Sequence, residues 1–212
     1  VYEVAKKSNS GEVYVATPDQ KIIDLIEKNG GKGVLTSLKH QTGTDRVYEV
    51  YESKLNSEPN IIVNLQGDMP NIDPEAIAKL VSYIGEGKCD ICTLASSFSS
   101  EKELADENNV KVVVKDKIKI NEFSQATDFF RTNSKKYENL YHHVGIYAFT
   151  NKALIRYVSL KRSKLEIERK LEQLRAMENK MSIHVGLISS SPLSVDTEKD
   201  LQEIKKLMEK NE

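Results

Sequence analysis

The first part of the chain alternates between short apolar runs and segments in which apolar residues recur at helical spacing. Residues 61–65 are apolar almost throughout and lie between turn residues, which indicates a central parallel strand. Strands are also predicted at 12–17, 33–36 and 90–96, and helices at 19–28, at 73–84 and after Thr44, which can cap a helix with Val47, Val50 and Tyr51 facing inward.

This alternation of strands and helices predicts an α/β fold. We expect a doubly wound, mostly parallel sheet with helices on both faces. Residues 1–7 have the pattern of the last turns of a helix and run into Ser8-Asn9-Ser10-Gly11. An α/β domain usually opens on a strand, so we expect the given sequence to begin inside the domain.

The pattern changes after Ser100. Residues 110–114 and 118–123 alternate around a polar tripeptide, which predicts a β-hairpin. Residues 128–138 are mostly polar and are expected to form a long loop. Further strands are predicted at 141–149 and 182–188, and helices at 152–158, 166–178 and 197–210. We interpret residues 1–212 as a single domain in which 100–150 form an inserted β-rich lobe.

The charge balance excludes several classes of partner. Lysine and arginine number 31 against 32 acidic residues, so the net charge of −1 gives no electrostatic reason to expect binding to nucleic acid or to an anionic membrane. No apolar run approaches the roughly 20 residues that span a bilayer, and the start does not resemble a signal peptide. We therefore expect a soluble, cytoplasmic protein.

The two cysteines, Cys89 and Cys92, have the spacing of a redox or zinc motif, but a second pair is missing. They fall in a predicted strand, where residues three apart point to opposite faces. We expect ordinary core thiols in a reducing compartment.

Three polar segments are candidates for chemistry. Gln66-Gly67-Asp68 follows the strand at 61–65, and ligands of open α/β sheets gather outside the carboxyl ends of the strands. There Gly67 could let the backbone turn and approach a ligand, and the carboxylate of Asp68 would suit magnesium. The alternative is a turn without a role.

The second candidate is the segment 39–46, where polar side chains and a glycine lead directly into a helix. Backbone amides at the start of that helix can face an anion or a base edge. The alternative is simple capping by Thr42 or Thr44.

The third candidate is Val195-Asp196-Thr197, where Asp196 leaves the last strand and Thr197 begins the last helix. If the two strand ends converge, Asp196 and Asp68 could hold one metal ion between them. The alternative is an acidic helix start that the helix dipole favours.

Together these segments resemble the 3-deoxy-manno-octulosonate (Kdo) cytidylyltransferase family. The resemblance spans essentially the whole chain, and the order and separation of its motifs are more specific than any one of them. The motifs are His40-Gln41-Thr42-Gly43-Thr44-Asp45-Arg46, Gln66-Gly67-Asp68-Met69-Pro70, Asn109-Val110-Lys111-Val112-Val113, His143-Val144-Gly145-Ile146-Tyr147, Leu171-Glu172-Gln173-Leu174-Arg175 and Val195-Asp196-Thr197.

The resemblance implies a Rossmann-like fold of the nucleotide-diphospho-sugar transferase type and an activity. Members transfer CMP from CTP to Kdo and release pyrophosphate, for lipopolysaccharide biosynthesis, and are usually homodimers; the 100–150 lobe is the expected dimerisation lobe. By position, Asp68 and Asp196 would be catalytic and hold Mg²⁺. The nucleotide would lie near Gln41, Gly43, Thr44, Arg46, Gln66 and Gly67, and the sugar near Gln125, His143, Tyr147, Glu172 and Gln173.

Other histidines are expected to be structural. His40, His142, His143 and His184 lack helical metal-ligand spacing, and neighbours on one strand point to opposite faces. Only His143 matches a position of the family, and we interpret His142 and His184 as structural.

The chain departs from the family pattern at three places. The family's opening strand and basic phosphate loop have no counterpart in the given sequence, so we expect such a segment before Val1. Gln125 replaces an arginine, a change that is not conservative at a bidentate site and for which Arg131 could compensate. Met69 replaces an acid. These departures leave two alternatives open: a cytidylyltransferase for a modified Kdo such as 8-amino-Kdo, and a weakly active nucleotide-binding homologue.

Overall fold

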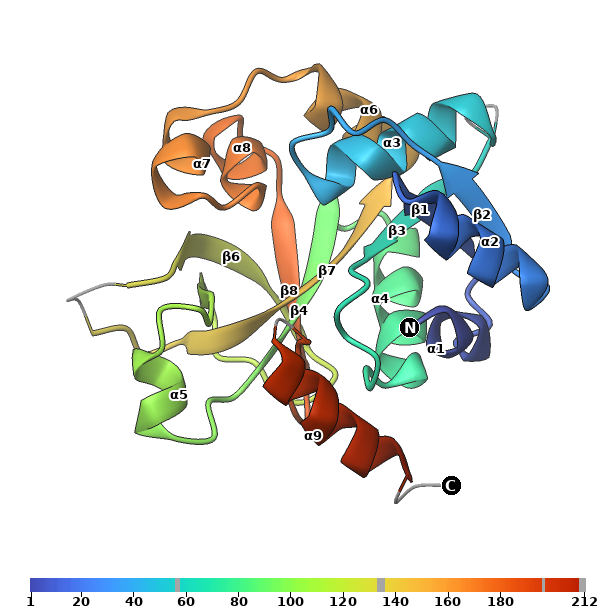
Figure 1. Ribbon diagram of the computed structural model, residues 1–212. Coiled ribbons are helices and arrows are strands. Elements are labelled where there is room, and N and C mark those ends of the chain that lie inside the picture. The colour runs from blue at the N-terminus through green and yellow to red at the C-terminus, as the bar shows by residue number, and fades with distance from the viewer. Residues whose placement is uncertain (56–57, 133–135, 196, 210–212) are drawn as a thin grey trace.

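The computed structural model describes residues 1–55, 58–132, 136–195 and 197–209 (Figure 1). Its helices are α1 (Tyr2–Lys7), α2 (Gln20–Lys28), α3 (Gly43–Ser53), α4 (Pro74–Gly85), α5 (Glu101–Ala105), α6 (Asn151–Ser159), α7 (Lys164–Arg169), α8 (Gln173–Glu178) and α9 (Glu198–Glu209). Its strands are β1 (Tyr14–Thr17), β2 (Lys32–Leu35), β3 (Ile61–Leu65), β4 (Ile91–Ser96), β5 (Lys111–Val114), β6 (Phe123–Phe130), β7 (Leu140–Thr150) and β8 (Ile183–Ile188). The α/β class expected from the alternation is confirmed.

The main sheet has six strands in the order β3-β7-β4-β8-β6-β5, and β1 and β2 form a separate parallel pair. Because β5 also pairs with β7, strands β7, β4, β8, β6 and β5 form a closed circuit. In the described part of the chain β4–β8 is the parallel pairing of this sheet, and its other pairings are antiparallel. The expected predominance of parallel pairing is therefore wrong, because the apolar pattern of a buried strand does not encode the direction of its neighbours.

The expected central position of β3 is also wrong. This strand lies at one end of the six-stranded order and runs antiparallel to β7. Its apolar run has another cause: Ile62 packs in the cluster with Tyr51 of α3 and Leu154 of α6, whereas Ile61 and Val63 pack against the cluster that contains α4. Helices cover both faces of the strand, so both sets of alternating side chains are apolar.

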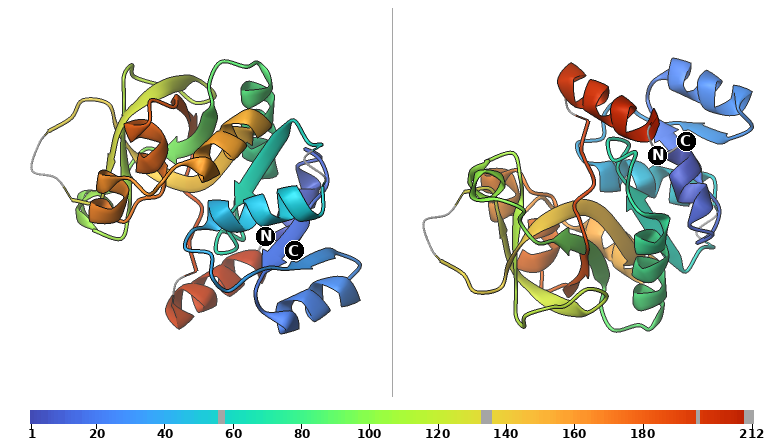
Figure 2. Two further views of the ribbon diagram at one scale, coloured as in Figure 1. Left: turned by 90° about the horizontal axis from the view of Figure 1, so that it is seen from above. Right: turned by 90° about the horizontal axis from the view of Figure 1, so that it is seen from below.

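Strand β7 separates the two core clusters of the sheet. Tyr147 and Phe149 point into the cluster shared with α3 and α6, and Ile146 and Ala148 into the cluster shared with α4. Figure 1 shows α3 and α6 together on one side of β3 and β7, with α7 and α8 beside them. Helix α9 lies outside the sheet, on the side of the molecule that carries α1 and α2 (Figure 2).

The predicted hairpin needs a correction in its second strand. Strand β5 pairs with Phe123–Phe130 and not with residues 118–123, where Ile120 makes only an isolated bridge to Leu187. Asn121 has a left-handed backbone with φ of 70°, which interrupts the extended run. The predicted loop at 128–138 is wrong at its start, because Phe129 and Phe130 are buried members of β6, and residues 133–135 of that prediction lie outside the described residues.

The predicted helix at 166–178 is two helices. Lys170 has a left-handed backbone with φ of 54° and ends α7, and α8 starts at Gln173. No glycine or proline marks this break in the sequence. The bend turns α7 back beside α8 and places the residues between them at the site described below.

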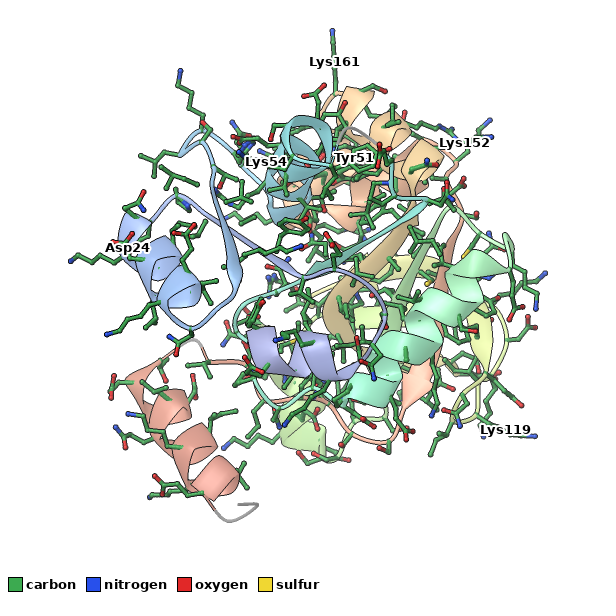
Figure 3. All side chains as sticks on the ribbon, turned by 90° about the vertical axis from the view of Figure 1, so that its right-hand side faces the viewer. Asp24, Tyr51, Lys54, Lys119, Lys152 and Lys161 are labelled. Atoms are coloured by element: carbon green, nitrogen blue, oxygen red, sulfur yellow. The ribbon has the colours of Figure 1, made fainter. Side chains whose placement is uncertain are left out.

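Three smaller expectations can be compared with the fold. Cys89 and Cys92 are free and buried, as expected, although both belong to one apolar cluster and Cys89 precedes β4. None of the described helices is long and apolar enough to cross a membrane. The amphipathic helices behave as predicted: Tyr51 of α3 is 1% exposed, whereas Asp24 points outward from α2 (Figure 3).

Candidate active site

The start of α3 and the end of β3 meet at Gly43. A Cβ atom at this position would lie 2.9 Å from Gln66 Nε2 and 3.4 Å from Asn64 Nδ2. Glycine is therefore the residue that lets the helix approach this closely. Two predicted nucleotide-binding segments, 41–46 and 66–68, are brought together here.

The cap of α3 is Thr42, whose hydroxyl accepts a hydrogen bond from the N–H of Asp45 at 3.2 Å. The suggestion that Thr44 caps the helix is wrong, because Thr44 already lies in its first turn. Thr44 is instead buried, and its Oγ1 accepts a hydrogen bond from Asn64 Nδ2 at 3.2 Å. This bond fixes the start of α3 to β3.

Arg46 and Gln41 flank this junction and have polar partners of their own. The guanidinium of Arg46 donates to Thr36 Oγ1 at 2.5 Å and to the carbonyl of Ser37 at 3.1 Å. The side chain of Gln41 is exposed and accepts a hydrogen bond from Arg162. Both predicted nucleotide-binding side chains thus lie at the same end of α3.

Asp68 follows the end of β3 and faces the segment that leads to α9. Ser194 Oγ donates to Asp68 Oδ2 at 2.9 Å, while the other carboxylate oxygen, Oδ1, is buried without a hydrogen-bond partner among the described residues. The N–H of Val195 donates to the backbone carbonyl of Asp68 at 2.9 Å. The predicted partner Asp196 comes next in the chain and lies outside the described residues.

Gly67 does not have the conformational role expected of it. Its φ is outside the left-handed region, and an added Cβ would meet nothing within 4 Å. The turn itself therefore does not require glycine. Met69, which stands where the family has an acid, is buried in the apolar cluster of α4 and does not contribute a polar group.

Three of the predicted sugar-binding residues and Thr44 line one small cavity. Tyr147 comes from β7, and Glu172 and Gln173 come from the junction of α7 and α8. Ile91, Phe149 and Tyr157 complete the lining. The cavity adjoins the start of α3, so the nucleotide and sugar segments share a border at Thr44.

Glu172 is an acid in an apolar setting. Burial raises its pKa above that of an ordinary glutamate, and hydrogen bonds from Thr44 and Thr42 oppose the shift only in part. Its Oε2 atom is buried without a partner among the described residues. Burial, with Glu172 and Tyr157 nearby, likewise raises the pKa of Tyr147. The cavity therefore favours neutral groups that can donate hydrogen bonds.

His143 lies next to this cavity but is held in the core. Its ring centroid is 5.6 Å from that of Tyr147, and its Nε2 is 3.0 Å from Thr93 Oγ1. That hydroxyl has one proton and lies 2.6 Å from the carbonyl of Ile146, so we assign the proton of His143 to Nε2. Burial lowers the pKa of His143 to about 3, which keeps the ring neutral.

Gln125 is not brought to the site with the other predicted residues. It is exposed on β6 and pairs with His184 across the sheet, whereas its neighbours Ser124 and Ala126 are buried. Arg131 does not replace the missing cation there, because its guanidinium binds the carbonyls of Glu107 and Asn108.

The remaining histidines have structural contacts. His142 Nδ1 lies 2.7 Å from Glu103 Oε1, His184 Nδ1 lies 2.7 Å from the hydroxyl of Tyr83, and His40 pairs with Glu49. No group of three or more histidine, cysteine or acidic side chains in the described part of the chain could hold a metal ion.

Sequence reasoning missed a buried ion pair beside the site. Glu166 is 0% exposed and receives two hydrogen bonds from Arg175, at 2.9 and 2.7 Å. Burial alone would raise the pKa of Glu166, yet hydrogen bonds from Arg175, Ser163 and Arg162 hold it below its ordinary value. The one signal in the sequence is Ser163-x-x-Glu166, a capping box in which Glu166 accepts from the N–H of Ser163.

Comparison with known proteins gives consistent matches. A family model described as cytidylyltransferase matches residues 1–183. The 3-deoxy-manno-octulosonate cytidylyltransferases of Bartonella henselae and Rickettsia bellii are 37% and 39% identical to this chain over 211 and 212 residues. These alignments cover 98% and 100% of the chain and 86% and 84% of the two relatives.

Solved structures extend the comparison. A CMP:2-keto-3-deoxy-manno-octonic acid synthetase complexed with CTP superposes with a TM-score of 0.88 at 31% identity, over 100% of this chain and 86% of the other. A UDP-glucose pyrophosphorylase complexed with UDP-glucose superposes with a TM-score of 0.69 at 10% identity, covering 100% and 86%. At that identity the second match is evidence for a shared fold alone.

Proposed function

The chain belongs to the cytidylyltransferase family, and we propose that it transfers CMP from CTP to Kdo and releases pyrophosphate. Its fold is that of the nucleotide-diphospho-sugar transferases. The observation that carries the proposal is the meeting of the predicted nucleotide and sugar segments at the start of α3, where Gly43 contacts Gln66 and Thr44 borders the cavity of Tyr147 and Glu172.

Magnesium fits the carboxylate of Asp68. Its Oδ1 is buried without a partner in the described part of the chain, and Mg²⁺ prefers one or two protein carboxylates together with phosphate oxygens and water. Asp68 and Asp196 would hold the ion. When bound, it would neutralise charge on the phosphates of CTP.

The reaction requires positioning more than covalent catalysis. The anomeric hydroxyl of Kdo attacks the α-phosphorus, and a new oxygen–phosphorus bond forms. The bond between the α-phosphorus and the oxygen that bridges to the β-phosphate breaks, pyrophosphate leaves, and the hydroxyl proton passes to solvent. We propose that the chain holds the nucleotide at the start of α3 and the sugar beside the groups that line the adjoining cavity. Burial keeps the hydroxyl of Tyr147 protonated, so this group can donate a hydrogen bond to a sugar oxygen, and burial favours the protonated form of Glu172.

Further parts of the proposal rest on the family resemblance. We propose that the product serves lipopolysaccharide biosynthesis in the cytoplasm, and free buried thiols are consistent with a reducing compartment. We also propose a homodimer formed through the 100–150 lobe. The side chains of Tyr141 and Phe149 in β7 are buried within the chain, so this contact would use exposed groups of the lobe such as Leu104 and Ile120.

The two alternative functions are a cytidylyltransferase for a modified Kdo and a weakly active homologue that binds the nucleotide. Gln125 is exposed and neutral, which keeps open a preference for a modified Kdo such as 8-amino-Kdo. The test is pyrophosphate release by the protein with CTP and magnesium, compared for Kdo, 8-amino-Kdo and no sugar. We expect release with Kdo. Faster release with the amino sugar would favour that substrate, and no release with either sugar would contradict an enzymatic function.

A further inference from the structure

Arg162 connects the nucleotide segment to the sugar-side helices. It lies between α6 and α7, and its Nη1 donates a hydrogen bond to Gln41 Oε1 at 2.9 Å across 121 residues of sequence. Its Nε donates at the same time to Glu166 Oε1 at 3.0 Å. One guanidinium thus bridges a side chain near the start of α3 and a carboxylate of α7.

The anchor of this bridge is rigid. Glu166 is fully buried and is held by Arg175, which is itself 3% exposed. Arg175 also stacks over the ring of Tyr157, with Cζ 4.5 Å from the centroid, and lies 3.4 Å from Asp45 Oδ1. Arg162 therefore binds Gln41 from a fixed point, although its own side chain is 42% exposed.

The bridge also determines the orientation of the amide of Gln41. A guanidinium can only donate, so the atom that it meets must be the carbonyl oxygen of Gln41. The NH₂ group then points away from Arg162 with both protons available, and no other hydrogen bond to this side chain is found among the described residues. Such an amide is oriented to donate to an acceptor on the ligand.

We propose that Arg162 is a positioning residue for CTP, which fixes the amide of Gln41 as a hydrogen-bond donor toward the nucleotide. This inference rests on the proposed function, because Gln41 is assigned to the nucleotide there. In this role Arg162 acts through its hydrogen bond to Gln41 and not through a contact of its own with the substrate. Its loss should weaken CTP binding without changing the binding of Kdo.

The experiment compares Arg162→Gln with Lys161→Gln, a matched control. Lys161 is the neighbouring cation and extends away from the body of the molecule (Figure 3). We expect Arg162→Gln to raise both KM for CTP and the calorimetric Kd for CTP roughly five- to tenfold, the size of one charge-assisted hydrogen bond near the surface. The values of kcat and of KM for Kdo should change less than about twofold on this account, and Lys161→Gln should leave all of them unchanged.

Two further variants separate positioning from a purely structural ion pair. Gln41→Glu keeps an acceptor for Arg162 but removes the NH₂ donor, so CTP should bind more weakly. The double variant Gln41→Ala with Arg162→Gln should bind CTP no more weakly than Gln41→Ala alone. Unchanged CTP affinity in Arg162→Gln, whatever its thermal midpoint, or full additivity in the double variant, would overturn the proposal.

Calorimetric measurement of CTP binding tests the role of Arg162 separately from the proposed reaction, which is tested by pyrophosphate release. A protein that binds CTP but releases no pyrophosphate would contradict the proposed reaction, and the comparison of CTP affinities would still decide the role of Arg162. A protein that binds no CTP would overturn both.

Discussion

The backbone N–H of Val195 donates a hydrogen bond to the carbonyl oxygen of Asp68, at a distance of 2.9 Å. Two more bonds join the same segments: Ser194 Oγ to Asp68 Oδ2 and the N–H of Leu193 to Asn71 Oδ1, each at 2.9 Å. The segment before α9 is therefore fastened to the turn after β3. This arrangement supports the proposal that Asp68 and Asp196 act together, because Val195, the residue before Asp196, is hydrogen-bonded to Asp68.

Because Gly43 lies so close to Gln66, we expect Gly43→Ala to weaken the binding of CTP. The new methyl group would meet Gln66 Nε2 at 2.9 Å, and this flexible amide can move away at little cost to the fold. We expect KM for CTP to rise about tenfold or more, as for a displaced hydrogen-bonding side chain, with a small change in the thermal midpoint.

Gly85→Ala, at the end of α4, is the matched control for this variant. Its methyl group would make only an ordinary contact, 3.6 Å from Ile61 Cδ1. Steady-state kinetics and thermal unfolding of both variants check the prediction. Equal values of KM for CTP in the two variants would contradict it.

The raised pKa of Glu172 predicts a dependence of stability on pH. The folded protein favours the neutral acid, so the stability that this acid contributes is fully present below the pKa of an unfolded glutamate. It is lost as the pH rises toward the folded pKa. Glu172→Gln cannot ionise and avoids this loss. Measured by thermal unfolding, the midpoint of the variant should rise relative to the wild type as the pH increases from about 4.5, and a constant difference would contradict the shift.

Replacing one partner of the buried ion pair between Glu166 and Arg175 should strongly lower the free energy of unfolding. Arg175→Leu leaves the carboxylate of Glu166, which is 0% exposed, with the partly exposed Arg162 as its one cationic partner among the described residues. We expect a loss of about 3–5 kcal/mol in the free energy of unfolding, the usual cost of one unpaired buried charge. Urea unfolding measures it, with exposed Glu168→Gln as the control. A loss below about 1 kcal/mol, the range of surface pairs, would mean that the pair is not buried in solution.

Local signals in the sequence account for many of the elements. Asp19 and Asp73 were recognisable starts of α2 and α4, and both cap their helices in the structure. The strand pairings were not predictable in this way, because the apolar run of β3 has the same appearance in a central strand and in an end strand covered by helices on both faces. The break at Lys170 has no glycine or proline to mark it, so periodicity alone joined α7 and α8.

The residues of the candidate site were also predictable from the sequence only in part. Gln66, Asp68 and Glu172 belong to short motifs, and the structure brings the segments of Gln66 and Glu172 to one end of α3. Arg162 and Ser194 act through partners that are more than 100 residues distant in sequence, so only the fold could reveal them. Gln125 shows the opposite case: its motif position suggested the site, but the alternation of β6 directs it to solvent.

The most direct test of the account compares pyrophosphate release by the wild type and by Asp68→Asn, with CTP, Kdo and magnesium. The substituted amide keeps the shape of the side chain and an acceptor for Ser194 but loses the charge, so the thermal midpoint of the variant should stay within a few degrees of the wild type. We predict that the wild type releases pyrophosphate only when Kdo is present, with equimolar CMP-Kdo, and that the variant loses at least about a hundredfold in kcat. Full activity of Asp68→Asn, or no release by the wild type, would contradict the account.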